Sequence, residues 1–390
     1  MRKTALILAF LALALPARAE DVQSFKSNLN QALAAWTADR PGEGKLSFAE
    51  PIQVQAQASG AFLIKVSELA WLAPISGANR ATIDFGPSEL LVAPGQGGWT
   101  VSGHVSDLVR FTANGQVRAA AKFSRNRIAG LWDDKRGAFT KLNVELEGLG
   151  VEFASGDNIV ASTAKLTAAS SADSSQAAID LASVIGYRAA DRTEINLEQA
   201  RLDLSQKPLK GHGRLTFAWR HQAPAPRMPG APQEVNPVRL SLKGMADPFD
   251  WRSVLQELAP AAADGSNPFG KALWSRIEPH LHKQNAKVTV AESQAQSVHL
   301  TARIKGEARF PPQAPTTGAF TGKLSGVQDR LKGISGGGSA GMLSSIAVLG
   351  ILSATGIPDG KGNLDYQIDI APDGQILLNG KKAGGLLPKL

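Results

Sequence analysis

Apolar residues recur at every second position through most of the chain. The pattern begins at Lys45, and each short alternating segment is bounded by Gly, Pro, Asn or Asp. Such alternation is typical of antiparallel strands with one dry face. Since no helical pattern of useful length interrupts residues 45–169, we expect a meander rather than parallel β-α-β units. The predicted strands lie at residues 52–58, 62–66, 81–85, 89–93, 100–105, 116–123, 142–146, 151–153, 159–166, 195–204 and 214–219.

A helical spacing of apolar residues precedes this meander. It predicts a helix over residues 21–38, with Asp21 or Ser24 as the N-cap and Arg40-Pro41-Gly42 as the stop. The apolar residues of this helix are expected to pack in the core. They are Phe25, Leu29, Leu33 and Trp36.

The second half of the chain mixes helices with strands. Residues 174–184 fit either a short helix or a strand, and the proline-rich residues 222–237 predict an extended loop. A strand at residues 238–242 precedes two helices, which begin at Asp247-Pro248 and Asn267-Pro268 because proline suits the first helical position. The second of these helices is expected to bend near Pro279. A long alternating strand follows at residues 300–310.

The last part of the chain, from Thr317 to Leu390, contains a helix with apolar residues on every side. This helix, at residues 341–354, lies between a Gly-punctuated strand (318–326) and a strand-turn-strand segment (361–380) that turns at Asp373-Gly374. We expect the helix to be covered all round and to plug one side of a sheet. The candidate plug residues are Met342, Leu343, Ile346, Leu349, Ile351 and Leu352.

Together these patterns predict a mainly β protein with a few helices. The first 19 residues are set apart, residues 20–221 hold the N-terminal helix and β meander, and residues 222–237 form a proline-rich loop. Residues 238–390 hold the helix pair, the long strand and the C-terminal strand-helix-hairpin unit.

The first residues have the parts of a secretory signal peptide. Arg2 and Lys3 precede an uncharged run from Thr4 to Leu15, and Ala17 and Ala19 fit a cleavage site before Glu20. The run is shorter than the roughly 20 residues that span a bilayer, although an uncleaved anchor is the alternative. These features predict export to the periplasm of a Gram-negative envelope.

Charge and cysteine content narrow the class of protein further. The formal charge is +8 over 390 residues, and loss of the three basic residues in the leader lowers it to +5. No concentrated basic stripe is visible, so nucleic acid is not an expected partner. The chain has no Cys, which rules out disulfides and a lipoprotein anchor and leaves stability to burial.

Three motifs could belong to a catalytic or metal site, and each also has a simpler structural interpretation. Gly337-Gly-Ser339-Ala-Gly341 matches G-x-S-x-G, but the last histidine, His299, precedes it, so the hydrolase order cannot be built. His280 and His282 stand two apart, which separates their rings on a helix. Trp132 to Gly137 predicts a charged turn. We therefore expect neither catalytic residues nor a metal or other cofactor, and we expect most tryptophans to pack in the core.

The order of elements over most of the mature chain resembles a known family, most sharply from about Gly318 to Pro388. The segments Thr317-Gly-Ala-Phe-Thr-Gly-Lys-Leu-Ser-Gly-Val-Gln-Asp-Arg-Leu331, Gly362-Asn-Leu-Asp-Tyr-Gln-Ile-Asp-Ile370 and Asp373 to Gly380, with Leu386-Leu-Pro388, carry the likeness. The order resembles a family of Gram-negative, mainly alphaproteobacterial, exported proteins with a domain of unknown function, distantly similar to AsmA-like envelope proteins. The resemblance implies an elongated, curved antiparallel sheet with helices at one end or side, and supplies no site residues.

Two functions fit these features. The first is binding or carrying a lipid or other hydrophobic ligand in an apolar groove of the sheet, which would make a lipid or a membrane surface the partner. The second is a structural role in envelope or outer-membrane assembly with an envelope protein as the partner and no ligand. An enzyme is not expected.

Overall fold

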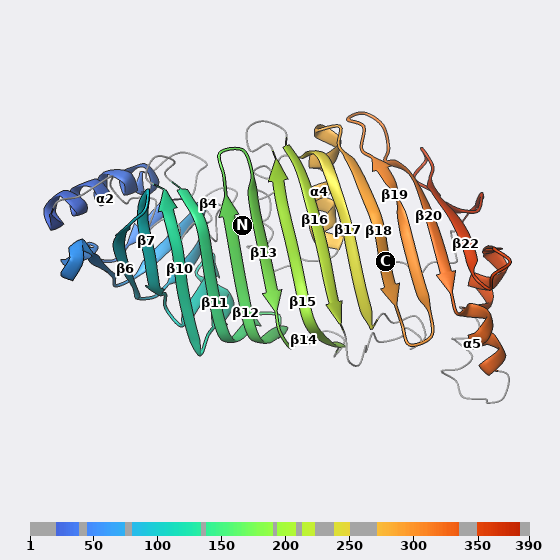
Figure 1. The fold of residues 1–390 in the computed structure, drawn as a ribbon, viewed down its shortest axis with the longest axis horizontal. Helices are drawn as coiled ribbons and strands as arrows, with labels where there is room; N and C mark the ends of the chain where they lie inside the picture. Colours follow the sequence, from blue (N-terminus) through green and yellow to red (C-terminus); the bar gives the residue numbers. More distant parts are fainter. Residues whose placement is uncertain are drawn as a thin grey trace. The chain divides into compact units, whose positions relative to one another are not determined.

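The computed structural model describes residues 21–38, 45–74, 80–133, 138–189, 193–207, 213–222, 238–249, 271–334 and 349–382. These residues divide into two compact units, one formed mainly by residues up to 182 and the other mainly by residues from 191 onward. The protein is mainly β with few helices, as the alternating pattern predicts, and its strands pair antiparallel. Figure 1 shows the strands of each unit side by side.

In the residues that the structure describes, the N-terminal unit contains the α-helix α2, a short 3-10 helix (Ala58–Gly60) and strands that meet at β11. Its elements are α2 (Val22–Thr37), β1 (Lys45–Phe48), β2 (Gln53–Ala56), β3 (Phe62–Val66), β4 (Leu69–Pro74), β5 (Arg80–Phe85), β6 (Ser88–Gly95), β7 (Gly98–His104), β8 (Leu108–Ala113), β9 (Gln116–Lys122), β10 (Arg125–Asp133), β11 (Ala138–Phe153), β12 (Asn158–Ser170) and β13 (Ser175–Leu181). One run of neighbouring strands is β2-β3-β6-β7-β10-β11, and another is β1-β4-β5-β8-β9-β11. Strands β12 and β13 extend from β11.

The two runs join because β11 changes partner along its length. Its first part pairs with β10 and its last four residues pair with β9. Gly148, with a φ of 60°, lies between the two parts, and a Cβ there would come within 2.5 Å of the Ser124 hydroxyl. The separate strands predicted at residues 142–146 and 151–153 are therefore one strand with a glycine irregularity.

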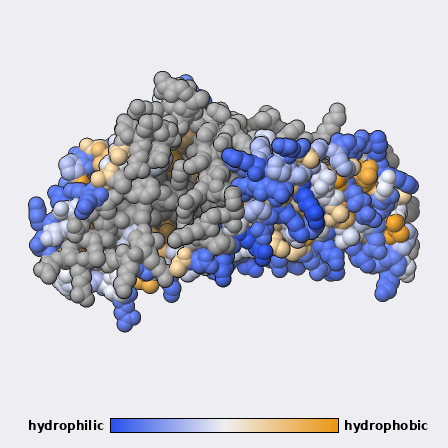
Figure 2. Space-filling model, turned by 90° about the horizontal axis from the view of Figure 1, so that it is seen from above, coloured by the Kyte–Doolittle hydropathy of each residue, from blue (hydrophilic) through white to orange (hydrophobic). Residues whose placement is uncertain are grey.

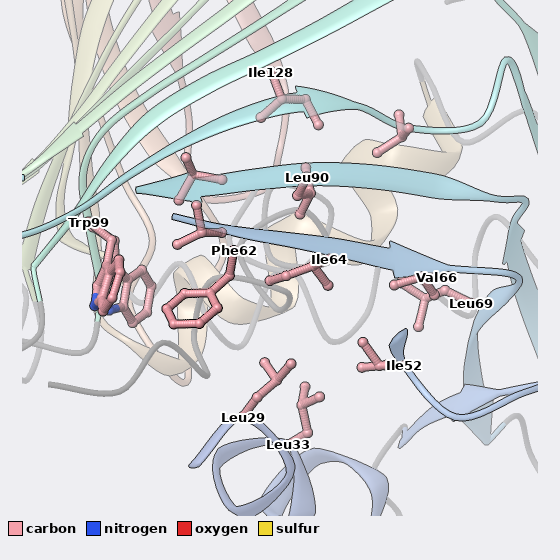
Figure 3. Packing of buried hydrophobic residues seen from close by; sticks show 14 of the residues in the cluster. Leu29, Leu33, Ile52, Phe62, Ile64, Val66, Leu69, Leu90, Trp99 and Ile128 are labelled. Carbon is pink, nitrogen blue, oxygen red and sulfur yellow. The ribbon is translucent and has the colours of Figure 1, made fainter. Parts of the chain in front are cut away.

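The core of this unit lies between the two runs of strands and α2. Asp21 caps the helix by accepting a hydrogen bond from the Ser24 backbone N–H at 2.8 Å, which settles the choice between the two predicted caps. Phe25 stacks on Phe62 with ring centroids 4.2 Å apart, and Trp99 meets Phe25 edge-on. Figure 3 shows Leu29 and Leu33 of the helix facing these β-strand side chains. The helical stripe is core, as predicted, and the Trp36 side chain lies outside the described residues.

The C-terminal unit is a meander in which most strands pair with the next along the chain. Its elements are β15 (Thr193–Lys207), β16 (Gly213–Gln222), β17 (Arg239–Phe249), α4 (Lys271–Lys283), β18 (Lys287–Gln296), β19 (Thr301–Arg309), β20 (Thr317–Ser325), α5 (Val327–Ile334), β21 (Ile357–Pro358), β22 (Leu364–Ile370), β23 (Ile376–Leu378) and β24 (Lys381–Lys382). The strand order is β15-β16-β17-β18-β19-β20-β22-β23-β24, with β21 also on β22. A short strand, β14 (Val184–Arg188), precedes the unit in sequence.

Several predictions in the second half need correction or stay untested. Asp247 and Pro248 belong to β17, not to a helix N-terminus, because a β-bulge against β16 accommodates the proline. Residues 174–184 contain a strand, β13, and the Asp373-Gly374 hairpin is confirmed. Helix α4 contains Pro279. The predicted helix over 251–258 and residues 223–237 lie outside the described residues, so the proline-rich loop and its domain boundary stay predictions.

The apolar C-terminal helix is only partly described, and its predicted all-round burial is wrong. Residues 349–355 are helical; Leu349 is fully buried and Leu352 packs against the same cluster. Ile351, however, is 38% exposed, since the helix lies with one side on β20 and β22 rather than inside a sheet. Met342, Leu343 and Ile346 lie outside the described residues. No helix in the described ranges is long and apolar enough to cross a membrane.

Candidate functional site

One face of the sheet of the C-terminal unit carries apolar side chains from strand to strand. Residues directly opposite each other in an antiparallel pair point to the same face. Leu202 of β15 faces Trp219 of β16, which in turn faces Leu242 of β17. Two residues further along the same strands, Leu204 faces Phe217 on the same side of the sheet. We name this side of the sheet the apolar face.

The apolar face continues across the later strands. Val290 of β18 faces Gly306 of β19, which faces Phe320 of β20, and Phe320 faces Ile368 of β22. Tyr366 lies on the same face, opposite Gly322. The apolar face therefore extends over seven paired strands, β15 to β20 and β22, and none of the cross-strand partners named above is charged.

Aromatic rings and glycines share positions on this face. A Cβ on Gly244 would lie 2.6 Å from the Phe217 ring, and one on Gly306 would lie 2.6 Å from the Phe320 ring. In each case the aromatic residue is the cross-strand partner of the glycine. The rings therefore lie over the glycines of the next strand, an arrangement known to protect glycine positions in sheets.

Burial differs along the apolar face. Its two ends are covered: Leu215, Ala246 and Ala308 are buried at one end, and Leu324 and Leu364 at the other. The residues between them are half-buried, neither enclosed in a core nor fully exposed. These half-buried residues include Leu202, Leu204, Phe217, Trp219, Leu242, Val290, Ile304, Phe320 and Ile368.

A histidine of α4 links this helix to the strands at the covered end of the apolar face. His282 contacts the Pro311 carbonyl oxygen through Nδ1 at 2.6 Å and the Thr316 hydroxyl through Nε2 at 3.1 Å, and its ring meets Phe310 edge-on. Both ring nitrogens are thus engaged in joining α4 to the strand ends. In the described part of the chain no group of three or more metal-binding side chains comes together.

A tryptophan and a histidine form a polar pair within the apolar face. The Trp219 indole Nε1–H donates to Nδ1 of His221 at 2.8 Å. Since the indole can only donate, Nδ1 carries no proton and the neutral ring holds its proton on Nε2. Burial lowers the pKa of His221, which favours this neutral form. His221 lies opposite Leu240 on the apolar face.

The opposite face of the same sheet carries ion pairs between neighbouring strands. Lys287 and Glu307 approach to 2.6 Å across β18 and β19, and Arg214 and Asp247 to 2.8 Å across β16 and β17. These side chains are 37–57% exposed, so each pair contributes little to stability. These ion pairs show that the charged face of the sheet is the one exposed to water.

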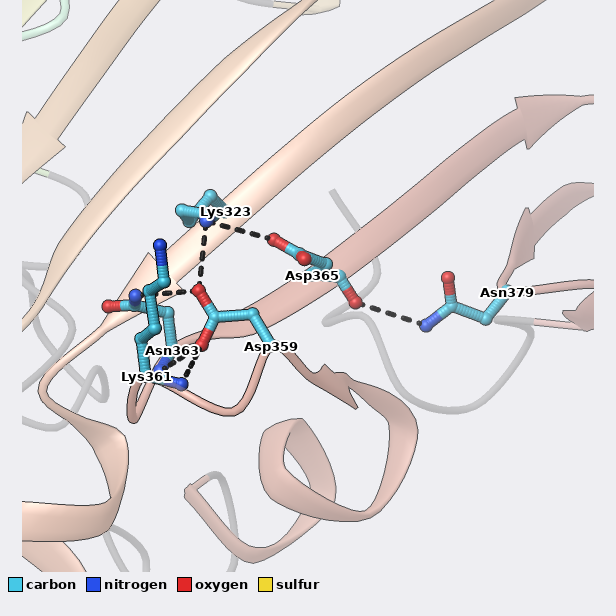
Figure 4. A network of polar contacts seen from close by, with 6 residues as sticks. All are labelled: Lys323, Asp359, Lys361, Asn363, Asp365 and Asn379. Carbon is cyan, nitrogen blue, oxygen red and sulfur yellow. Dashed lines mark hydrogen bonds and ion pairs between the residues drawn. The ribbon is translucent and has the colours of Figure 1, made fainter.

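A network of hydrogen bonds and ion pairs surrounds Asp359, in the turn before β22. The Asp359 carboxylate accepts hydrogen bonds from the backbone N–H groups of Lys361 and Asn363 and from the Asn363 amide, and it pairs with Lys323 at 2.9 Å (Figure 4). The Asn363 amide and Lys323 hold the pKa of Asp359 far below its usual value. Lys323 also approaches Asp365 at 3.5 Å. This network fixes the turn between β21 and β22.

The remaining motifs are structural or lie outside the described residues. Trp71, Trp99 and Trp132 are buried, as expected of core tryptophans, and Trp132 packs edge-on against Phe139. The G-x-S-x-G segment at 337–341 and the cleavage residues Ala17, Ala19 and Glu20 are not in the described ranges. In the view of Figure 2 the coloured surface is mostly hydrophilic, and hydrophobic residues form small separate patches.

These features define an antiparallel β-meander protein whose sheet has one apolar and one charged face. A family model described as "Uncharacterized protein conserved in bacteria (DUF2125)" matches residues 138–382, well over half of the chain, and the chain belongs to that family. The predicted domain of unknown function is thereby confirmed. No curated protein and no solved structure matches the chain.

Proposed function

We propose that this chain binds a hydrophobic ligand, such as the acyl chains of a lipid, on the apolar face of β15–β22. The half-buried state of that face carries the proposal. A face of Leu, Val and aromatic side chains covered at both ends and half-buried in the middle gains free energy when further apolar surface covers it, at about 25 cal/mol per Å². The Trp219–His221 pair supplies the kind of isolated polar group that orients ligands in apolar sites.

The proposed location is the periplasm of a Gram-negative cell. The signal-peptide pattern of the first 19 residues supports export, and the resemblance to AsmA-like envelope proteins supports a role at the envelope. Mass spectrometry of the mature N-terminus from a periplasmic fraction tests this part: we expect Glu20 as the first residue. A chain that starts at Met1 and stays with the membranes would indicate an uncleaved anchor.

Lipid extraction tests the ligand. We expect mass spectrometry of the natively purified protein to find an enriched lipid, and Leu242→Gln to lower its amount severalfold. Lys243→Gln is the matched control, because Lys243 is the next residue of β17 and points to the charged face. Equal lipid in both variants, or none in the unaltered protein, would contradict binding on this face; thermal unfolding of each variant shows that the sheet is intact.

A structural role in envelope assembly is the second candidate. Three isoleucines near the C-terminal edge are exposed to solvent: Ile357 is 58% exposed, Ile376 39% and Ile351 38%. Exposed apolar side chains that together form a patch can mark a site where another protein binds. Cross-linking in intact cells tests this role. A partner lost on Ile357→Ser, with unchanged lipid content, would favour assembly over lipid binding.

A further inference from the structure

A pocket in the N-terminal unit lies outside both the apolar face and the family-matched segment. Its volume is about 530 Å³, within the range of small-molecule sites. It is found at one end of the strands β2, β3, β6 and β7, where β3 and β7 end and β6 begins. Val66 and Ser67 come from the end of β3, and Ser88 from the start of β6.

Four polar side chains form a continuous row along this pocket. Gln53, Lys65, Glu89 and His104 are successive cross-strand partners on β2, β3, β6 and β7, and all four line the pocket. Directly opposite residues lie about 5 Å apart, so the row presents an amide, an ammonium, a carboxylate and an imidazole at regular spacing. A core-forming row of strand residues flanks it, since Ile64 is fully buried.

The charges in this row compensate one another. Lys65 Nζ lies 2.7 Å from Glu89 Oε1, and this hydrogen bond lowers the pKa of Glu89, with a smaller contribution from the nearby His104. Asp107 adds a further carboxylate to the lining. A strong anion would therefore meet Glu89 and Asp107, and a strong cation would meet Lys65.

Hydrogen bonds from Asn126 hold the segment after β7 that lines the pocket. Asn126, which is 7% exposed, accepts a hydrogen bond from the Val105 backbone N–H at 2.7 Å and donates to the Val105 carbonyl at 2.8 Å. The same amide donates to Asp107 Oδ1 at 3.0 Å. The loop that follows β7 is thus held in one position, as a preformed site requires.

One lining group has an unmet hydrogen bond. The Ser67 hydroxyl is shielded from solvent and has no partner among the described residues. A buried hydroxyl without a partner costs about 1–3 kcal/mol, so such groups usually bind water or a ligand. The nearby Ser88 hydroxyl makes only a long contact of 3.4 Å to the Gly86 carbonyl.

We propose that this pocket binds a neutral, hydroxyl-rich ligand of the size of a mono- or disaccharide. Each ligand hydroxyl donates and accepts, which matches a row of alternating donors and acceptors without adding a net charge. Because the Ser67 hydroxyl is shielded in the free protein, its side chain rotates toward the pocket to bond to one of those hydroxyls. Pro51 and Pro87 present apolar surfaces to the C–H groups of the ligand.

The test is binding of defined probes to the full chain by saturation-transfer NMR and calorimetry. The neutral probes are maltose, cellobiose, diacetylchitobiose and inositol, and the charged comparators are citrate and spermidine. We expect at least one neutral probe to bind and Ser67→Ala to weaken it about tenfold, the value of one hydrogen bond. Ser102→Ala, on β7 but outside the lining, is the matched control and leaves the affinity unchanged.

Gln53→Ala is a second variant that keeps the test decisive if Ser67→Ala does not fold. Gln53 is exposed at the start of β2, so its removal leaves the core intact and is expected to weaken the same probe. The proposal is overturned if no neutral probe binds the unaltered protein, if citrate or spermidine binds more tightly, or if the folded pocket variants bind as the unaltered protein does.

Discussion

Substitution of Gly306 by alanine tests whether the glycines of the apolar face are needed for strand contact. An alanine Cβ at this position would lie 2.3 Å from the Ala319 carbonyl oxygen and 2.5 Å from the Phe320 Cα. Both are backbone atoms of β20, so the clash cannot be relieved by a side-chain rotation. The β19–β20 ladder must open locally instead, since Gly306 and Phe320 are directly paired.

The expected loss follows from three contributions. Overpacking costs about 1–3 kcal/mol, and each weakened ladder hydrogen bond adds about 0.5–1.5 kcal/mol. The smaller entropy of the unfolded chain returns about 0.4–1 kcal/mol. With one ladder hydrogen bond weakened, the midpoints of these ranges predict that Gly306→Ala loses about 2 kcal/mol in the free energy of unfolding of the C-terminal unit.

Gly322→Ala is the matched control. Gly322 lies on β20, on the same face and opposite Ile304, but its nearest contact for a Cβ would be the Tyr366 Cβ at 3.6 Å, an ordinary van der Waals distance. We expect this variant to be as stable as the unaltered protein or slightly more stable.

Urea unfolding followed by circular dichroism, with hydrogen exchange of the β19 and β20 amides, measures both variants. The exchange data assign the loss to the C-terminal unit, because a chain with two units need not unfold in one step. Equal midpoints and equal amide protection for the two variants would refute the reasoning that close strand contact requires glycine at position 306.

Three further outcomes follow from the polar contacts. The lowered pKa of Asp359 stabilises the folded state above the unfolded value near 4, so stability is lost as the pH falls below it, and Asp359→Asn removes this slope in acid-unfolding titrations. Because the pKa of His221 is lower in the folded state, the unfolded chain takes up a proton at a higher pH than the folded chain does, and stability falls as the pH drops below about 6.5. We expect His221→Gln to abolish this dependence of stability on pH. Nitrogen-15 NMR of the unaltered protein should find the neutral ring protonated on Nε2. Asn126→Ala leaves the Val105 backbone groups without partners and lowers the free energy of unfolding by about 1–3 kcal/mol for each buried group in chemical denaturation. An unchanged midpoint for this variant would show that water replaces the amide.

The sequence predicted those helices and turns that depend only on residues close together in the chain. The helix over Val22–Thr37 follows from its apolar spacing and the Asp21 cap, and the β22–β23 hairpin follows from Asp373-Gly374. The mainly β class follows from alternation that one dry face imposes. Strands β1, β4, β8, β10, β14, β18 and β21 were not among the predicted strands, although β1, β4, β8 and β10 lie in the region expected to be a meander.

Alternation determined which side of each strand would be dry, but it could not determine what each strand would lie beside. Only the tertiary structure decided that β11 pairs with β10 before Gly148 and with β9 after it. It also decided that Asp247-Pro248 lies at a β-bulge and does not start a helix, and that His221 lies on the apolar face. It also assembled the polar row of the pocket from four strands spread over residues 53–104. The physical reason is that strand register depends on hydrogen bonds between residues far apart in the chain, whereas periodicity and capping depend only on near neighbours.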